Sequence, residues 1–141
     1  MTRLISLLKY TIYNFTQLQE VATIETVTNH HSEALETAVQ LFKDIYQVTE
    51  TWPRMQVFGL IMDIRRAAMG IATNLGEGQH QGMGPEFSEF LVISRQELTE
   101  LKGHLVAAQE NPALSAAGIE PLLHKAADLD GMLQVLAASL N

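Results

Sequence analysis

Residues 58–78 are the segment that most limits how this chain can fold. Their sequence, FGLIMDIRRAAMGIATNLGEG, places apolar side chains around most of the circumference of a helix. A surface helix of a globular protein has one apolar stripe, whereas a helix that is apolar on nearly every side is enclosed by neighbouring elements. The segment is therefore predicted to be the central helix of a bundle, running from about residue 56 to residue 78.

Three further segments have an apolar stripe at helical spacing. The first covers about residues 32–51, where Ser32 is a favourable N-cap and Pro53 ends the helix. A second helix is expected from Pro85 to about residue 110, and a third over about 119–140 with Pro121 in its first turn. The stripes consist of Leu35, Ala38, Phe42, Ile45 and Thr49; of Phe87, Leu91, Ser94, Leu98, Leu101, Leu105 and Ala108; and of Ile119, Leu122, Ala126, Leu129, Leu133, Leu136 and Leu140. Four such helices joined by short turns predict an all-α fold, an antiparallel up-down-up-down four-helix bundle.

The bundle is assigned to residues 32–141, and residues 1–31 are assigned to an N-terminal extension. The extension has its own stripe of Leu4, Leu8, Thr11, Phe15, Leu18 and Ala22, which favours a helix over about residues 3–20. Residues 21–28 are rich in Thr and β-branched side chains, which fits a strand about as well. Asn29, His30 and His31 are expected to form a looser, solvated join to the bundle.

Composition and charge exclude several classes of protein. The 141 residues carry a net charge of −7, with nine basic residues spread along the chain, so bulk charge does not provide a surface for nucleic acid. No cysteine is available for a disulfide or a thiolate metal site. No apolar run approaches the roughly 20 residues that span a bilayer. We expect a cytoplasmic protein with no membrane association.

The central helix also contains the residues most able to form a functional surface. Arg66, Gly70, Asn74 and Glu77 follow one another at four, four and three residues and form a polar seam along an otherwise apolar helix. Subunit register and helix capping are the favoured roles of this seam, because buried polar groups need hydrogen-bond partners. Glycines within the helix, Gly59 and Gly70, predict the close approach of another backbone.

The adjacent arginines, Arg65 and Arg66, lie about 100° apart on a helix and cannot both face the same neighbour. They could contact phosphate or the carboxylates of a partner. The favoured interpretation is that at least one of them pairs with Asp63 or with a glutamate of another helix or subunit.

Catalysis and metal binding have little support in the sequence. An amide and a carboxylate without a His, Cys or Ser at a suitable offset make a poor active site. Di-iron bundles use two Glu residues and two Glu-x-x-His steps, and only Glu77 with His80 has that spacing. Glu100 with His104 and Glu120 with His124 are spaced by four residues instead of three. We therefore expect no enzyme, no cofactor and no metal.

The central helix also carries a set of motifs at fixed offsets. Arg65-Arg66-Ala67 is followed by the segment of residues 70–78, GIATNLGEG, which ends in Glu77-Gly78. Tyr46 and Trp52-Pro53 lie upstream, and Glu86-Phe87, Phe90-Leu91 and Glu100-Leu101 lie downstream. Over about residues 34–110 this pattern resembles the four-helix-bundle proteins encoded in intervening sequences of bacterial large-subunit ribosomal RNA genes. The family usually has Ser, Pro and a Gly-Ser step where this chain has Gly70, Ala72 and Gln96-Glu97, and the last change places a carboxylate where small residues are usual.

The resemblance implies a function as well as a fold. It implies that this chain, like members of the family, is a non-enzymatic protein that assembles into a homopentameric ring. A relative of the family is the accessory protein of diversity-generating retroelements, which binds a reverse transcriptase and nucleic acid. A ring is also favoured by the excess of apolar surface over what four helices can cover. The resemblance implies an oligomeric accessory or scaffold protein whose partner is RNA or a reverse-transcriptase-like protein, with Arg65, Arg66, Gly70, Asn74, Glu77 and Gly78 as the candidate interface. The alternative, favoured by the acidic charge, is a protein–protein interaction module with no nucleic-acid role.

Overall fold

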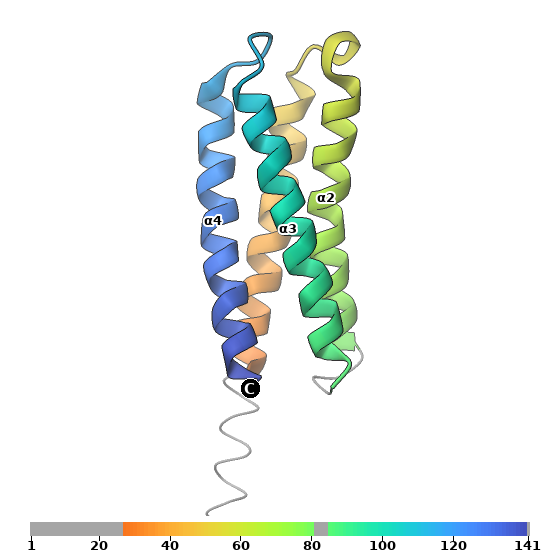
Figure 1. Cartoon of the computed structure of the whole chain (residues 1–141), viewed down its shortest axis with the longest axis vertical. Coiled ribbons are helices and arrows are strands. Elements are labelled where there is room, and N and C mark those ends of the chain that lie inside the picture. Colours follow the sequence, from red (N-terminus) through yellow and green to blue (C-terminus); the bar gives the residue numbers. More distant parts are fainter. Residues whose placement is uncertain (1–26, 81–84, 141) are drawn as a thin grey trace, which may run out of the picture.

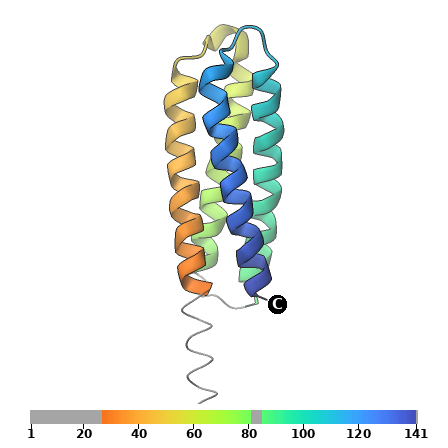
Figure 2. The same cartoon turned by 90° about the vertical axis from the view of Figure 1, so that its left-hand side faces the viewer.

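The computed structural model describes residues 27–80 and 85–140, and over these residues the chain forms four helices and no strand. The first helix covers residues 27–50 and is followed by α2 (Arg54–His80), α3 (Phe87–Gln109) and α4 (Ala116–Ser139). The helices run alternately up and down along one long axis (Figures 1 and 2), which confirms the predicted antiparallel four-helix bundle. The expected helix over residues 3–20 lies outside the described residues.

The first helix begins earlier than the sequence analysis predicts. It is already helical at residue 27 and continues without interruption through Ser32, so the predictions of an N-cap at Ser32 and of a loose join at residues 29–31 are wrong. The expected junction between residues 31 and 32 therefore lies inside a continuous helix. Its buried face includes His31, Ala34 and Leu41, whereas Leu35 and Phe42 of the predicted stripe are only half-buried.

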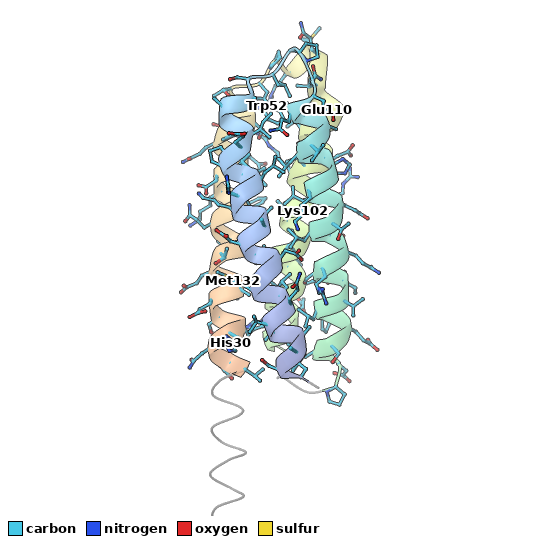
Figure 3. The ribbon with its side chains drawn as sticks, turned by 60° about the vertical axis from the view of Figure 1, so that its left-hand side comes forward. His30, Trp52, Lys102, Glu110 and Met132 are labelled. Carbon is cyan, nitrogen blue, oxygen red and sulfur yellow. The ribbon has the colours of Figure 1, made fainter. Side chains whose placement is uncertain are left out.

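The first helix ends as expected just before Pro53. The backbone N–H groups of Thr51 and Trp52 donate to the carbonyls of Val48 and Thr49 in a final tight turn. Trp52 is buried and lies at the end of the bundle where the chain turns from the first helix into α2 (Figure 3). α2 follows at once, with a break in helical geometry at Val57, where φ is −131° and ψ is 28°.

The stripe predicted for α3 is confirmed in full, because all seven of its residues are buried. Pro85 and Glu86 form a turn ahead of the helix, so the predicted start at Pro85 is two residues too early. α4 starts earlier than expected, at Ala116, which places Pro121 in its interior beyond the first turn. Six of the seven predicted stripe residues of α4 are buried, and Leu140 is half-buried at the end of the helix.

The four helices enclose one apolar core along the length of the bundle. α2 packs on α3 and α3 packs on α4, while α2 and α4 lie diagonally across the core and their backbones are not adjacent. The first helix lies beside both α2 and α4 (Figures 1 and 2). Within the described part of the chain, no helix is both long enough and apolar enough to cross a membrane.

Candidate interface on α2

The two adjacent arginines of α2 point in different directions, as their spacing predicts. The Arg65 Nε donates a hydrogen bond to Thr49 Oγ1 at 2.9 Å, and its guanidinium lies 3.8 Å from the centre of the Tyr46 ring. Both partners belong to the first helix, so Arg65 is held against that helix. Stacking on an aromatic face with a directed hydrogen bond fixes the orientation of a guanidinium group and limits the motion of the side chain.

Arg66 lies on the outer surface of the bundle. Its side chain is 77% exposed, and Nη1 is 3.9 Å from Asp63 Oδ1, one turn earlier on the same helix. This contact confirms the prediction that one of the arginines pairs with Asp63. An exposed ion pair at this distance contributes little to stability, so Arg66 can exchange Asp63 for a carboxylate of a partner at small cost.

The polar seam continues along the side of α2 that faces α3. Asn74 Nδ2 donates to the carbonyl of Gly70 at 2.8 Å, which satisfies the amide within the helix. Opposite Gly70 lies the side chain of Glu97, placed so that a Cβ atom at residue 70 would be 3.0 Å from its carboxyl carbon. The close approach predicted at Gly70 is therefore real, but the neighbour is a side chain rather than a backbone. At Gly59 nothing lies within 4 Å, and the prediction of a close approach there is wrong.

Glu97 occupies the space that the missing side chain of Gly70 leaves. Burial raises the pKa of its carboxyl group above the ordinary value, and the charge of Glu100 raises it further. No cation lies within ion-pair distance of Glu97 among the residues that the structure describes. The helices pack at this position even though a carboxylate stands where small residues are usual, because the large side chain on α3 is matched by the absence of one on α2.

The Glu77-Gly78 step at the end of α2 has a packing role at only one of its residues. Glu77 is exposed, whereas Gly78 is buried against the ring of Phe87 at the start of α3. A Cβ atom at residue 78 would lie 2.6 Å from Phe87 Cδ2, closer than such atoms come in real structures. Gly78 thus allows the first turn of α3 to pack directly on the backbone of α2.

A buried histidine that the sequence analysis assigned to a solvated join belongs to the same end of the bundle. His31 is fully buried, and its Nε2 donates to the carbonyl of Leu75 at 2.7 Å. Its ring packs edge-to-face on Phe87, with 5.2 Å between the ring centres. Within the described residues, Nδ1 has no hydrogen-bond partner. The sequence signal was available: His31, Ala34, Ala38, Leu41 and Ile45 follow at alternating three- and four-residue steps, but a stripe of alanines and a histidine is easily overlooked.

The outward face of α2 carries a row of large apolar side chains. Met55, Phe58, Met62 and Met69 are 98%, 60%, 42% and 52% exposed. Phe58, Met62 and Met69 follow at steps of four and seven residues and therefore share one face of the helix, and exposed Met55 lies just before the break at Val57. We call this row the α2 stripe. It shows that α2 is enclosed on one side only within a single subunit, so the prediction of a helix enclosed on nearly every side is wrong for the subunit taken alone.

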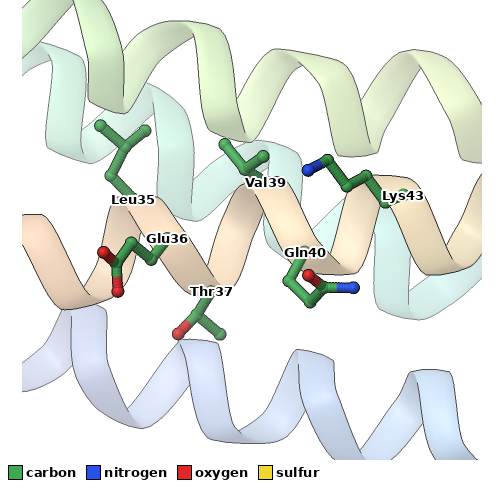
Figure 4. A pocket seen from close by; sticks show the side chains of 6 residues that line it. All are labelled: Leu35, Glu36, Thr37, Val39, Gln40 and Lys43. Carbon is green, nitrogen blue, oxygen red and sulfur yellow. The ribbon is translucent and has the colours of Figure 1, made fainter.

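The neighbouring flank of the first helix extends this apolar surface. Val39 and Tyr46 are also exposed, and Val39 points towards α2 together with Leu35 (Figure 4). Tyr46 is joined to α2 by the stacked Arg65. Among the described residues, six of the ten exposed large hydrophobic side chains lie on these two helices.

Two ion pairs link α4 to its neighbours. Lys125 donates to Asp44 of the first helix, and this hydrogen bond lowers the pKa of Asp44, with burial opposing the shift and Gln40 adding to it. Lys102 of α3, labelled in Figure 3, donates to Asp130 at 2.9 Å. These lysines are engaged within the subunit and are not part of a free basic surface.

In residues 27–80 and 85–140, no group of three or more His, Asp or Glu residues is placed to hold a metal ion. One hollow on the surface is open and is lined by residues of the first helix alone (Figure 4). Of the site residues named from the sequence, Gly70 and Gly78 make room for side chains of α3, Arg65 is held by the first helix, and Arg66 and Glu77 are exposed.

Comparison with known proteins gives the family of the chain. No curated protein matches the sequence. A family model described as 23S rRNA-intervening sequence protein matches residues 30–135, which include most of all four helices and every residue of the candidate interface. This match confirms the resemblance drawn from the Arg65-Arg66 and Glu77-Gly78 motifs, and the chain belongs to the 23S rRNA-intervening sequence protein family.

Proposed function

We propose that this protein is a non-catalytic scaffold that assembles from several copies of the bundle, with the family's five-membered ring as the expected form. The observation that supports the proposal is the α2 stripe, continued on the first helix by Val39 and Tyr46. Contiguous exposed apolar patches on soluble proteins usually mark interaction sites, because their burial in an assembly is favourable. Arg66 lies between Met62 and Met69 on the same face and adds a charge that can select a partner.

Light scattering coupled to size exclusion tests the assembly. The expected result is a mass of several subunits at micromolar concentration. A monodisperse single subunit would contradict the proposal. Met62→Asp should lower the mass by placing a carboxylate in the stripe, and Glu36→Asp, on the outer side of the first helix, is a control that should leave the mass unchanged.

The name of the family suggests RNA as the partner of the assembled scaffold. In the described part of the chain the basic residues are few, and two of them, Lys102 and Lys125, are paired with carboxylates. Contact with RNA would therefore be local, through exposed basic residues outside the α2 stripe, such as Arg95 of α3, repeated around an assembly. Fluorescence anisotropy with a structured RNA hairpin at low and moderate salt tests this role, because phosphate contacts weaken as salt rises.

The second candidate function is a protein–protein interaction module with no nucleic-acid role. It is favoured by the net charge of −7, which repels a polyanion over most of the surface. If the assembled protein does not bind the RNA hairpin at either salt concentration, the result supports this second function and contradicts the RNA role. Arg95→Ala, on the exposed side of α3 and outside the α2 stripe, is the informative variant, because it should weaken RNA binding in the first case and leave the RNA result unchanged in the second.

A further inference from the structure

The α2 stripe is an exposed apolar surface, and the outer face of α4 is complementary to it in side-chain size and in charge. We propose that the stripe of one copy packs against the outer face of α4 on a second copy. This inference rests on the proposed self-association and specifies which two surfaces meet. The α4 face is defined by Ala127, Asp128, Gly131 and Val135, all of them exposed.

The first argument is one of size. The α2 stripe presents large, flexible side chains, and methionine adapts well to irregular surfaces. The α4 face presents small residues around Val135, which is 50% exposed. Gly131 lies inside α4, where glycine is less favourable for a helix than alanine. No atom of another helix among the described residues lies within 4 Å of the position of its missing Cβ, so packing among residues 27–80 and 85–140 does not account for this glycine. A large side chain from a second copy, packed against α4 at this position, would account for it.

The second argument is one of charge. Arg66, in the middle of the α2 stripe, has only the loose contact with Asp63. Asp128, on the α4 face, makes no ion pair within the described part of the chain. Asp130, two residues further along α4, is instead bonded to Lys102. Opposite charges at the centres of two apolar surfaces favour one register of docking over others.

The third argument concerns the position of residues along the long axis of the bundle, which we call their level. α2 and α4 run in the same direction on different sides of the subunit (Figure 1). On α3, Glu97 packs on Gly70 and Lys102 bonds to Asp130. The two α3 positions are separated by about 7.5 Å along the axis, at about 1.5 Å per residue.

From these contacts, Met62 of α2 lies at about the level of Ala127 of α4, and Arg66 lies at about the level of Gly131. In a ring whose axis is parallel to the helices, neighbouring copies keep the same level. Met62 then meets Ala127, and the long side chain of Arg66 reaches Asp128.

Two different faces meeting in this way form a heterologous contact. Such a contact repeats from copy to copy and closes into a ring when the rotation between copies divides a full turn. A contact of the stripe with itself would stop at a dimer. The proposed pairing therefore accounts for an assembly of more than two copies.

Engineered cysteines test the pairing directly, because the chain has no cysteine of its own. Under mild oxidation, the double variant Met62→Cys with Ala127→Cys should form a ladder of covalent multimers on a non-reducing gel. Each single variant should remain a single chain. The matched control is Met62→Cys with Ala107→Cys, which places the second cysteine at about the same level on the exposed side of α3 and should give no ladder.

The outcomes separate this inference from the proposed function. A multi-subunit mass with a ladder in the double variant alone supports both. A multi-subunit mass with a covalent dimer from Met62→Cys alone, or with no cross-link in any variant, overturns the α2–α4 pairing and leaves self-association standing. A single-subunit mass for the parent chain overturns both. Arg66→Glu should raise the dissociation constant of the assembly about tenfold or more, and adding Asp128→Arg should restore it; failure of this rescue also counts against the pairing.

Discussion

The contact between Gly78 and Phe87 leads to a sharp prediction about two glycines at the end of the same helix. An alanine at position 78 would place its Cβ 2.6 Å from Phe87 Cδ2 and 2.8 Å from Cε2. Ordinary carbon–carbon contacts are about 3.5–4.0 Å, so the ring or the helix has to move by about 1 Å. Phe87 is fully buried, and its ring already packs against His31 on another side. Overpacking of this kind typically destabilises a core by about 1–3 kcal/mol.

Gly76 provides the control, because it lies two residues away and nothing is within 4 Å of its Cβ position. Both substitutions gain the helix propensity of alanine, which is worth up to about 1 kcal/mol. The propensity gain cancels when the two variants are compared, so the difference between them measures the clash alone. We expect Gly76→Ala to be stabilised by up to about 1 kcal/mol and Gly78→Ala to be less stable than Gly76→Ala by about 1–3 kcal/mol.

Urea denaturation followed by circular dichroism and by the fluorescence of the single tryptophan, Trp52, measures both free energies of unfolding. Phe87→Leu in the Gly78→Ala background should recover part of the loss, because a smaller side chain removes the overlap. The reasoning is refuted if Gly76→Ala and Gly78→Ala change the free energy of unfolding equally, or if Phe87→Leu destabilises the Gly78→Ala protein as much as it destabilises the parent.

Three further variants test single groups. The raised pKa of Glu97 means that the folded state binds its proton more tightly than the unfolded state, so the parent loses stability as pH rises above 4.5; Glu97→Gln should be more stable than the parent at neutral pH and should lose this dependence, as urea titrations across that range will show. Asp44 has a lowered pKa, so its contribution is present above pH 3.8 and disappears as pH falls below that value; Asp44→Asn should be less stable than the parent at neutral pH, and an equal acid-induced loss in both proteins would contradict this. His31→Ala should destabilise the bundle by about 2–4 kcal/mol through the lost hydrogen bond and the cavity left beside Phe87, and unchanged thermal unfolding would show that the buried ring contributes nothing.

The sequence predicts the bundle well where periodicity is strong and poorly where small or polar residues take core positions. The stripe of α3 was predicted in full because leucines recur there at alternating steps of three and four. The first helix was predicted with the correct end, but its start and part of its buried face were wrong, because His31 and Ala34 carry little apolar signal. Its start was placed at Ser32 on the strength of a capping preference, which the helix overrides by continuing from residue 27.

The candidate interface was only partly predictable for a related reason. The motif of Arg65, Arg66, Gly70 and Gly78 singles out the residues but does not say what they touch. That Gly70 faces Glu97, and that Arg65 stacks on Tyr46, depends on how neighbouring helices are rotated about their axes. Residue spacing along one helix does not contain this information. The family pattern pointed to Gln96-Glu97 as a departure, and the structure shows that Gly70 is its counterpart across the helix pair.

The diagonal placement of α2 and α4 has a mechanical consequence. The backbones of these helices are not adjacent, so a displacement of α2 reaches α4 through the side chains of the shared core and through the two helices between them. Each of the two helices in between contacts both α2 and α4 through side chains. The first helix does so through Tyr46 with Arg65 and through Asp44 with Lys125. α3 does so through Glu97 with Gly70 and through Lys102 with Asp130. A displacement of α2 is thus transmitted to α4 through both the first helix and α3. Weakening the contacts of one of these two helices leaves the contacts of the other to transmit it.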